Sequence, residues 1–182
     1  CGGVGLSAVM IAVAAGAQVV AIDVSEAALH AAVELGATAT INASAVEGGD
    51  VPTDVAERIR AATGGGAHLS IDALGSATTS LNSIAGLRKR GRHVQVGLML
   101  GADSRAPMPM DLIVARELEV LGSHGMAAHD YAAMLAGIAE GRLDPSRLVG
   151  RTISLDEAPA ALMAMDFPQA VTGITVIVPG AV

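Results

Sequence analysis

Aromatic residues are almost absent from this sequence. Its 182 residues include no Trp, one Tyr at position 131 (Tyr131) and one Phe at position 167 (Phe167). Aromatic stacking surfaces of the kind that many nucleic-acid-binding proteins use therefore cannot be assembled. The formal net charge of −7 points the same way, because a field of this sign repels a polyphosphate backbone. We expect no nucleic-acid partner, and a core built from aliphatic side chains and Met.

Cysteine is equally scarce, since Cys1 is the only one in the sequence. An internal disulfide is impossible, and no CxxC pair or Cys/His cluster with zinc spacing occurs. We therefore predict no metal site within this chain and a reducing compartment, the cytoplasm. The Cys1 thiol is expected to fill space beside the glycines that follow it.

Charge is missing from the start of the chain, where no Asp, Glu, Lys or Arg occurs between Cys1 and Ile22. An apolar run of this kind can indicate a membrane span or a signal sequence. Several glycines and Gln18 interrupt it, and it lacks a basic flank and a small-residue cleavage site. We favour a buried helix followed by a buried strand, and expect no membrane partner.

Short β-branched runs alternate with helical segments over most of the chain. The patterns predict helices at residues 4–15, 25–35, 52–62 and 76–87, and strands at 18–23, 38–41, 69–74, 93–97 and 117–124. A polar loop is expected from Glu47 to Asp50, and a proline loop over residues 98–109. This alternation predicts an α/β fold, a Rossmann-like doubly wound parallel sheet with helices on both faces.

The pattern changes after residue 124. We expect a helix over 128–140, a strand over 151–154, a helix over 156–165 and a strand over 173–178. These predictions divide the chain into a dinucleotide-binding domain, residues 1–124, and a small C-terminal α+β segment, residues 125–182.

The most informative group of residues is a glycine turn with an acid after the next strand. Gly2, Gly3 and Gly5 open the first helix, and Asp23 ends the strand that follows it. Glycines let backbone amides approach a pyrophosphate, and the helix dipole attracts its charge. A carboxylate about 20 residues on accepts the ribose hydroxyls of the adenosine half and repels a 2′-phosphate. The group therefore predicts a site for NAD in preference to NADP.

The usual fingerprint has an earlier glycine and a strand before it, and both would lie upstream of Cys1. We therefore expect a sheet that lacks its first and most central strand, with backbone groups left unpaired at the gap.

Several segments together resemble the coenzyme-binding half of zinc-dependent medium-chain alcohol dehydrogenases. They are CGGVGLSAVMIAVAAGA at the start, Asp23, the segments Glu34–Ala37, Asp72–Gly75 and Val94–Gly97, and Leu118 to Gly125. The resemblance covers nearly the whole chain. It implies hydride transfer between NAD and an alcohol or aldehyde, with zinc in a catalytic domain that this chain does not contain. It also implies that residues 125–182 return to that domain.

The resemblance implies a set of cofactor-binding residues: Gly2, Gly3, Val4, Gly5, Asp23, Val24, Ala73, Leu74, Val96, Gly97, Leu98, Ser123 and His124. Among them, Ala73 and Leu74 would cover the adenosine side, and residues 96–98 would line the nicotinamide ring. No catalytic residue is assigned, because the family's zinc ligands and proton relay belong to the other domain. The sequence departs from the family pattern near Gly173. A basic residue that could contact the pyrophosphate is often found there in the family and is replaced in this chain.

Three other kinds of function stay open. A regulatory module that senses NAD(H) without chemistry would explain why no catalytic side chain is visible, and zinc-free relatives that reduce quinones or enoyl thioesters share the fold. Methyltransferases also combine a glycine turn with a ribose-binding acid. A short-chain dehydrogenase is excluded, because its tyrosine needs a lysine four places on and Leu135 follows Tyr131 there.

The remaining polar and sulfur-containing residues have simpler expected roles. We expect Asp72 to accept hydrogen bonds from nearby backbone amides, and the basic cluster at residues 88–90 to lie at the negative end of a helix. The histidines other than His124 are treated as structural or solvated. Met99, Met108 and Met110 flank the proline loop as an apolar contact surface, and we expect a homo-oligomer.

Overall fold

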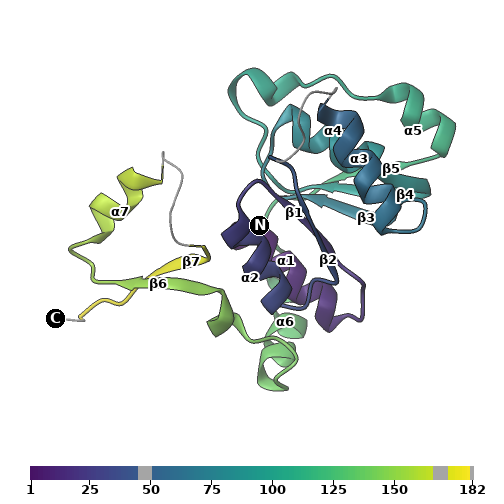
Figure 1. Ribbon diagram of the computed structural model, residues 1–182. Coiled ribbons are helices and arrows are strands. Elements are labelled where there is room, and N and C mark those ends of the chain that lie inside the picture. Colours follow the sequence, from purple (N-terminus) through teal and green to yellow (C-terminus); the bar gives the residue numbers. More distant parts are fainter. Residues whose placement is uncertain (45–50, 166–171, 181–182) are drawn as a thin grey trace.

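The computed structural model describes residues 1–44, 51–165 and 172–180, with side chains omitted at 51–53. The polar loop expected from Glu47 to Asp50, and Phe167, lie outside these residues. Helices and strands alternate from the first helix to the fifth strand (Figure 1). This alternation, with parallel pairing throughout, confirms the α/β fold class.

The elements follow the predicted order except for one additional helix at residues 110–116. The helices are α1 Gly3–Ala14, α2 Glu26–Glu34, α3 Val51–Ala62, α4 Ala77–Ala85, α5 Met110–Arg116, α6 Tyr131–Ala139 and α7 Ala158–Ala164. The strands are β1 Val20–Asp23, β2 Ala39–Asn42, β3 Ala67–Asp72, β4 Leu87–Gln95, β5 Glu119–Gly122, β6 Val149–Ile153 and β7 Ile174–Ile177. Short 3₁₀ helices occupy η1 Gly101–Arg105, η2 Ala128–Asp130 and η3 Pro145–Leu148.

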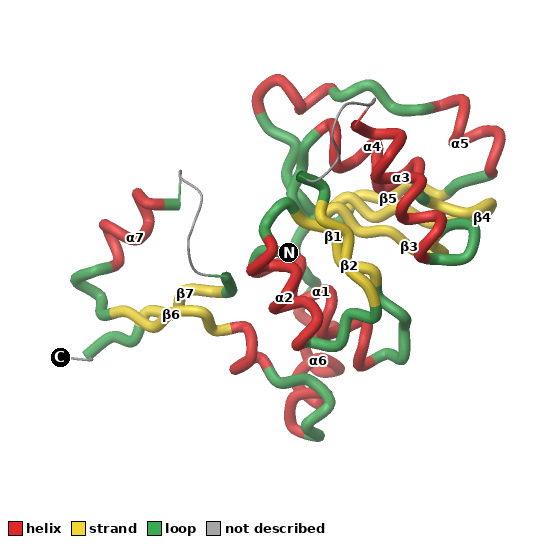
Figure 2. The backbone as a smooth tube through the Cα atoms, in the orientation of Figure 1, coloured by secondary structure: helices red, strands yellow, loops and turns green. Residues whose placement is uncertain are grey.

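In the described part of the chain the strands form three separate parallel sheets, β1–β2, β3–β4–β5 and β6–β7 (Figure 2). A doubly wound dinucleotide-binding sheet has the strand order 3-2-1-4-5-6. The first two sheets correspond to strands 3-2 and 4-5-6 of that order. The break in pairing between β1 and β3 therefore coincides with the position of the central strand.

Local sequence explains where α2 and α4 begin. The Ser25 side chain accepts a hydrogen bond from the Ala28 amide, as predicted from its place before Glu26. At α4, Ser76 and Thr79 form a reciprocal capping box, which satisfies two amides that the helix leaves without partners. Both caps place the helix starts at the carboxyl ends of β1 and β3.

The main core lies where α1 and α2 pack on β1. Its buried members are Leu6, Val9, Met10, Ala21, Leu29, Ala32, Leu35, Ala37 and Leu148. A second cluster joins Ile41 of β2 to Val55 and Ile59 of α3. The expectation of a buried first helix is met in part, since Leu6, Val9 and Met10 of α1 are buried whereas Val4 and Ile11 are 54% and 52% exposed. Among the described residues, no helix combines the length and apolarity needed to cross a membrane.

The expected position of the basic cluster is wrong. Strand β4 begins at Leu87, which pairs with Ala67, so the residues at 88–90 belong to the strand instead of a helix end. The C-terminal carbonyl of Ala85 in α4 accepts hydrogen bonds from two other arginines, Arg60 at 2.7 Å and Arg116 at 2.9 Å. The cations at the end of α4 therefore come from arginines distant in the sequence, and not from the residues at 88–90 that directly follow the helix.

Helix α5 was not predicted from the sequence. It follows the proline loop directly, and Pro109 at its N-cap position offers no side-chain hydrogen bond. Its last turn carries Arg116, whose guanidinium also donates to the Leu87 carbonyl at 2.9 Å. Arg116 thus connects the end of α5 to the start of β4 by a hydrogen bond.

Strands β6 and β7 and helix α7 stand to one side of the other elements in Figure 1. Their sheet pairs Val149 with Ile174 and Ile153 with Ile177. The proposed domain boundary after residue 124 stays a prediction.

Candidate functional site

The opening turn, residues Cys1 to Gly5, presents the amino end of a helix without a side-chain cap. Helix α1 starts at Gly3, and Gly2 at the N-cap position has an extended backbone and no side-chain hydrogen bond. The first turn carries no acidic residue. The first amides of a helix and its dipole create a positive end that favours an anion. A Cβ atom on Gly2 would meet no atom within 4 Å, so this turn is open on that side.

Asp23 lies directly beside the opening turn, although the sequence separates them by a helix and a strand. Its Oδ2 atom is 2.5 Å from the Cys1 ammonium, and its Oδ1 atom accepts a hydrogen bond of 2.9 Å from the Ser25 amide. The Cys1 thiol donates to the Ile22 carbonyl at 3.6 Å. The carboxylate at the end of β1 and the glycines at the start of α1 therefore belong to one site.

Asp23 is held in its ionised form. Burial alone would raise the pKa of its carboxyl group, but hydrogen bonds from the Cys1 ammonium and the Ser25 amide, with the ammonium charge, outweigh burial. The pKa of Asp23 is consequently lower than its ordinary value. The neighbouring Val24 side chain is 66% exposed. An ionised acceptor and an exposed apolar side chain thus stand next to each other at this strand end.

The first turn of α1 also meets the end of β3. A Cβ atom on Gly5 would lie 3.8 Å from the Cβ atom of Ala73, an ordinary van der Waals separation. Leu74, the next residue, is 71% exposed. The structure therefore brings Ala73 to the opening turn, with the exposed Leu74 next to it in the chain.

The other predicted residues line a cavity of about 390 Å³ at the carboxyl ends of β4 and β5. We call it the strand-end cavity, and its lining comprises Gln95, Val96, Gly97, Leu98, Met99, Gly122, Ser123 and His124. The Ser123 amide donates to the Gln95 carbonyl at 2.9 Å, which joins the two strand ends. In open α/β sheets, ligands bind at the carboxyl ends of the strands.

Sequence reasoning missed Gln95, Met99 and Gly122 in this cavity. A signal for Gln95 was present, because His93 and Gln95 are polar residues at alternate positions of an otherwise apolar strand end. Asp72 matches its prediction, since its Oδ1 atom accepts the amides of Leu74 and Gly75 at 2.9 and 3.1 Å. The strand-end cavity is thus bordered by buried polar groups as well as by apolar ones.

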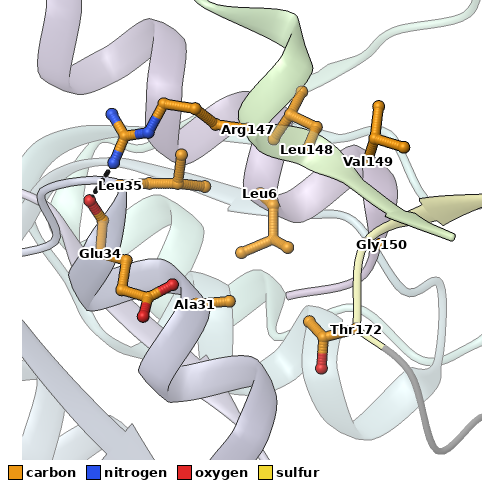
Figure 3. Close-up of a pocket in the computed structure, with 10 residues that line it drawn as sticks. Leu6, Ala31, Glu34, Leu35, Arg147, Leu148, Val149, Gly150 and Thr172 are labelled. Atoms are coloured by element: carbon orange, nitrogen blue, oxygen red, sulfur yellow. Dashed lines mark hydrogen bonds between the residues drawn. The ribbon is translucent and has the colours of Figure 1, made fainter.

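A second cavity, of about 440 Å³, lies between α1, α2 and the segment at 147–150 (Figure 3). Arg147 reaches across its rim and donates to the Glu34 carbonyl, while Leu6 and Leu35 form part of its apolar wall. None of the cofactor-binding residues predicted from the sequence lines this cavity, although Gly173, near which a basic residue is replaced, does. The cavity is formed where the C-terminal segment contacts α1 and α2.

The C-terminal segment also contacts the opening turn. A Cβ atom on Gly3 would lie 3.0 Å from Cγ1 of Ile174, the first residue of β7. An apolar side chain therefore packs against Gly3, close to Gly173, near which the resemblance implies a basic residue. In the described ranges, no group of three or more His, Cys, Asp or Glu side chains is arranged to hold a metal ion.

Comparisons with known proteins indicate the family of this chain. The family model described as "Zinc-binding dehydrogenase" matches residues 3–140. The chain is 35% identical over 179 residues to an "NAD-dependent alcohol dehydrogenase" of Sulfurisphaera tokodaii, covering 98% of this chain and 48% of that protein. A protein of the same name from Saccharolobus solfataricus is 32% identical, with the same two coverages.

A solved structure gives the same result. The alcohol dehydrogenase of Aeropyrum pernix superimposes with a TM-score of 0.81 and 25% identity, covering 98% of this chain and 48% of that one. The chain thus spans about half the length of the relatives that it matches. From the family match and these similarities, the chain belongs to the zinc-binding dehydrogenase family.

Proposed function

We propose that this chain is the NAD(H)-binding portion of a zinc-dependent alcohol dehydrogenase. The observation that carries the proposal is the contact between the Asp23 carboxylate and the opening turn. A dinucleotide needs a phosphate-binding helix start and a ribose acceptor within one nucleotide's length of each other. The names of the matched relatives support NAD as the dinucleotide.

The chain's own residues have distinct tasks in this proposal. The amides of the opening turn hold the pyrophosphate, and Asp23 accepts the adenosine ribose hydroxyls while repelling a 2′-phosphate. Ala73 and Leu74, with Val24, offer apolar surface to the adenosine half. The strand-end cavity receives the nicotinamide, lined by Val96, Gly97, Leu98, Ser123 and His124.

The residues present fit such a ligand, because exposed apolar side chains stand at the strand ends where rings would lie. Leu74 is 71% exposed and Leu98 is 61% exposed. When bound, NAD supplies the hydride acceptor for an alcohol, or NADH the donor for an aldehyde. We place the zinc ligands and the proton relay in a catalytic domain outside this chain, to which residues 125–182 return.

We also infer a small-molecule alcohol or aldehyde as substrate, a cytoplasmic location and a homo-oligomer. The oligomer is supported by β5, whose residues are all exposed, and by Met108 and Met110, which are 40% and 57% exposed. An exposed strand edge presents unpaired backbone groups that can pair with another chain. Sedimentation analysis of the purified protein tests this, and a monomer at micromolar concentration would contradict it.

Cofactor binding can be measured on this chain directly. Because the chain contains no Trp, the fluorescence of NADH reports binding without interference from protein indole emission. We expect NADH to bind at least about tenfold more tightly than NADPH, since a 2′-phosphate would meet the Asp23 carboxylate. Asp23→Asn should reduce this preference, whereas Asp156→Asn, at an exposed position in the C-terminal segment, should leave it unchanged.

Two results would count against the proposal. Absence of NADH binding would remove it, and tighter calorimetric binding of S-adenosylmethionine than of NADH would favour a methyltransferase. The reaction itself is tested with a polypeptide that joins a zinc-loaded catalytic domain to this chain, assayed for NAD reduction with a panel of simple alcohols. Cofactor binding without turnover by that polypeptide would support the NAD(H)-sensing alternative.

A further inference from the structure

A polar network, partly buried, lies between the β3–β4 pair and α4, next to the strand-end cavity. Its members are Ser70, Asp72, Thr79, Ser83, His93 and Gln95. The strand register places Ser70 opposite His93 and Asp72 opposite Gln95. Because residues two apart on a strand share a face, these four side chains project from the same side of the sheet. Asp72 and His93 are only 4% and 1% exposed.

The hydrogen bonds of Gln95 allow only one orientation of its amide. The Nε2 atom donates to Asp72 Oδ2 at 2.8 Å and to the Gly97 carbonyl at 3.0 Å. A reversed amide would place its oxygen against two other acceptors, one of them on the buried Asp72, and this costs free energy. The Oε1 atom of Gln95 is therefore left facing His93 Nε2, at 3.2 Å.

This orientation also assigns the proton of His93. Gln95 Oε1 can only accept, so the imidazole carries its proton on Nε2. The Nδ1 atom is left to accept from a serine hydroxyl, with Ser83 at 3.1 Å and Ser70 at 3.2 Å. Burial lowers the pKa of His93, although Gln95 and the charge of Asp72 act in the opposite direction. The neutral ring thus donates along the network toward Gln95.

The network ends at the two turns that border the candidate site. Asp72 Oδ1 binds the Leu74 and Gly75 amides after β3, while the Asp72 backbone carbonyl accepts the Val96 and Gly97 amides at 3.0 and 2.8 Å. Gln95 adds the side-chain bond to the Gly97 carbonyl. Gly97 lines the strand-end cavity. The hydrogen bond from Gln95 therefore fixes the orientation of a peptide group in the wall of that cavity.

We propose that Gln95, oriented by His93 and Asp72, is a positioning residue for the half of the ligand that enters the strand-end cavity. This rests on the proposed function, in which that half is the nicotinamide. Gln95 holds the Gly97 peptide in one orientation before the ligand arrives, so binding does not have to order that turn. The opening turn and Asp23, which we assign to the adenosine half, receive no bond from Gln95.

The test compares NADH with ADP-ribose, which has the adenosine and pyrophosphate parts but lacks the nicotinamide. Gln95→Met keeps the side-chain length and removes all three hydrogen bonds of the amide. We expect it to weaken NADH binding by about tenfold, the effect of losing one to two partly buried hydrogen bonds, while ADP-ribose affinity stays within about twofold. Arg92→Gln, on the exposed side of the same strand, is the matched control and should change neither affinity.

Two variants at residue 93 separate positioning from packing. His93→Leu removes the donor to Gln95 and should produce a smaller loss that is again selective for NADH. His93→Gln restores an amide N–H at this place and should recover much of that affinity. A uniform loss of both ligands by Gln95→Met, or no loss of either, overturns the positioning role. Failure of the unmodified chain to bind both NADH and ADP-ribose would instead overturn the proposed function, and this inference with it.

Discussion

The backbones of Gly75 and Gly97 lie so close together that a Cβ atom on Gly97 would be 2.3 Å from the Gly75 nitrogen. Conversely, a Cβ atom on Gly75 would be 2.4 Å from the Leu98 carbonyl oxygen. Gly75 also has a positive φ of +90°, which side chains of L-residues rarely adopt. The turn after β3 and the turn after β4 are therefore packed backbone to backbone, and together they border the candidate site.

Replacing Gly97 by Ala should destabilise the protein by about 1–3 kcal/mol, because the added methyl group meets backbone atoms that cannot rotate away. Urea unfolding followed by far-ultraviolet circular dichroism measures the change. Gly122→Ala is the matched control, since Gly122 ends the neighbouring strand and a Cβ atom there would meet nothing within 4 Å. Equal stability of the two variants would show that the turns can separate without cost.

Contacts of this kind could not be predicted from the sequence. The glycine turn, the acid at residue 23 and the Ser25 cap follow local patterns, and the structure has all of them near their expected places. The approach of Gly75 to Gly97 depends instead on how two neighbouring strands end. No local sequence pattern indicates this close approach. The sequence therefore predicts Gly97 as a residue that lines the site, but does not predict its contact with Gly75.

The errors have a similar origin. The residues at 88–90 looked like cations at a helix end because helix and strand follow each other without a loop, and composition alone does not locate the boundary. Helix α5 was missed since it is short and lacks a side-chain cap. The polar residues His93 and Gln95 were visible in the sequence, but only the strand register shows that they meet Ser70 and Asp72.

Arg116 is expected to stabilise the protein more than an exposed ion pair does. Its guanidinium donates to the carbonyls of Ala85 and Leu87, both at 2.9 Å, where α4 ends and β4 begins. Hydrogen bonds from charged donors contribute about 1.5–3 kcal/mol, so Arg116→Met should lower the free energy of unfolding by roughly 1–3 kcal/mol.

The control for Arg116 is Arg92, whose guanidinium pairs with Glu119 at 2.6 Å while both side chains are about half exposed. Exposed pairs contribute about 0–1 kcal/mol, so Arg92→Met should have a small effect. Thermal unfolding of the two variants under the same buffer conditions makes the comparison. A larger loss from Arg92→Met would contradict the proposed role of the helix-end carbonyls.

The stability of the protein should depend on the titration of His93. Its pKa is lowered by burial in the folded state, against an ordinary value of about 6.5 when unfolded. Between these two pKa values the unfolded chain binds more protons, so the free energy of unfolding rises with pH. The contribution is fully present above about pH 6.5 and is lost as the pH falls toward the folded-state pKa.

Unfolding measured in urea from pH 7.5 down to pH 5 tests this dependence, and His93→Gln should flatten the slope because the amide does not titrate. His129→Gln is the control, since the His129 side chain is 82% exposed and its loss should leave the slope unchanged. Identical slopes for the unmodified protein and His93→Gln would mean that another group is responsible.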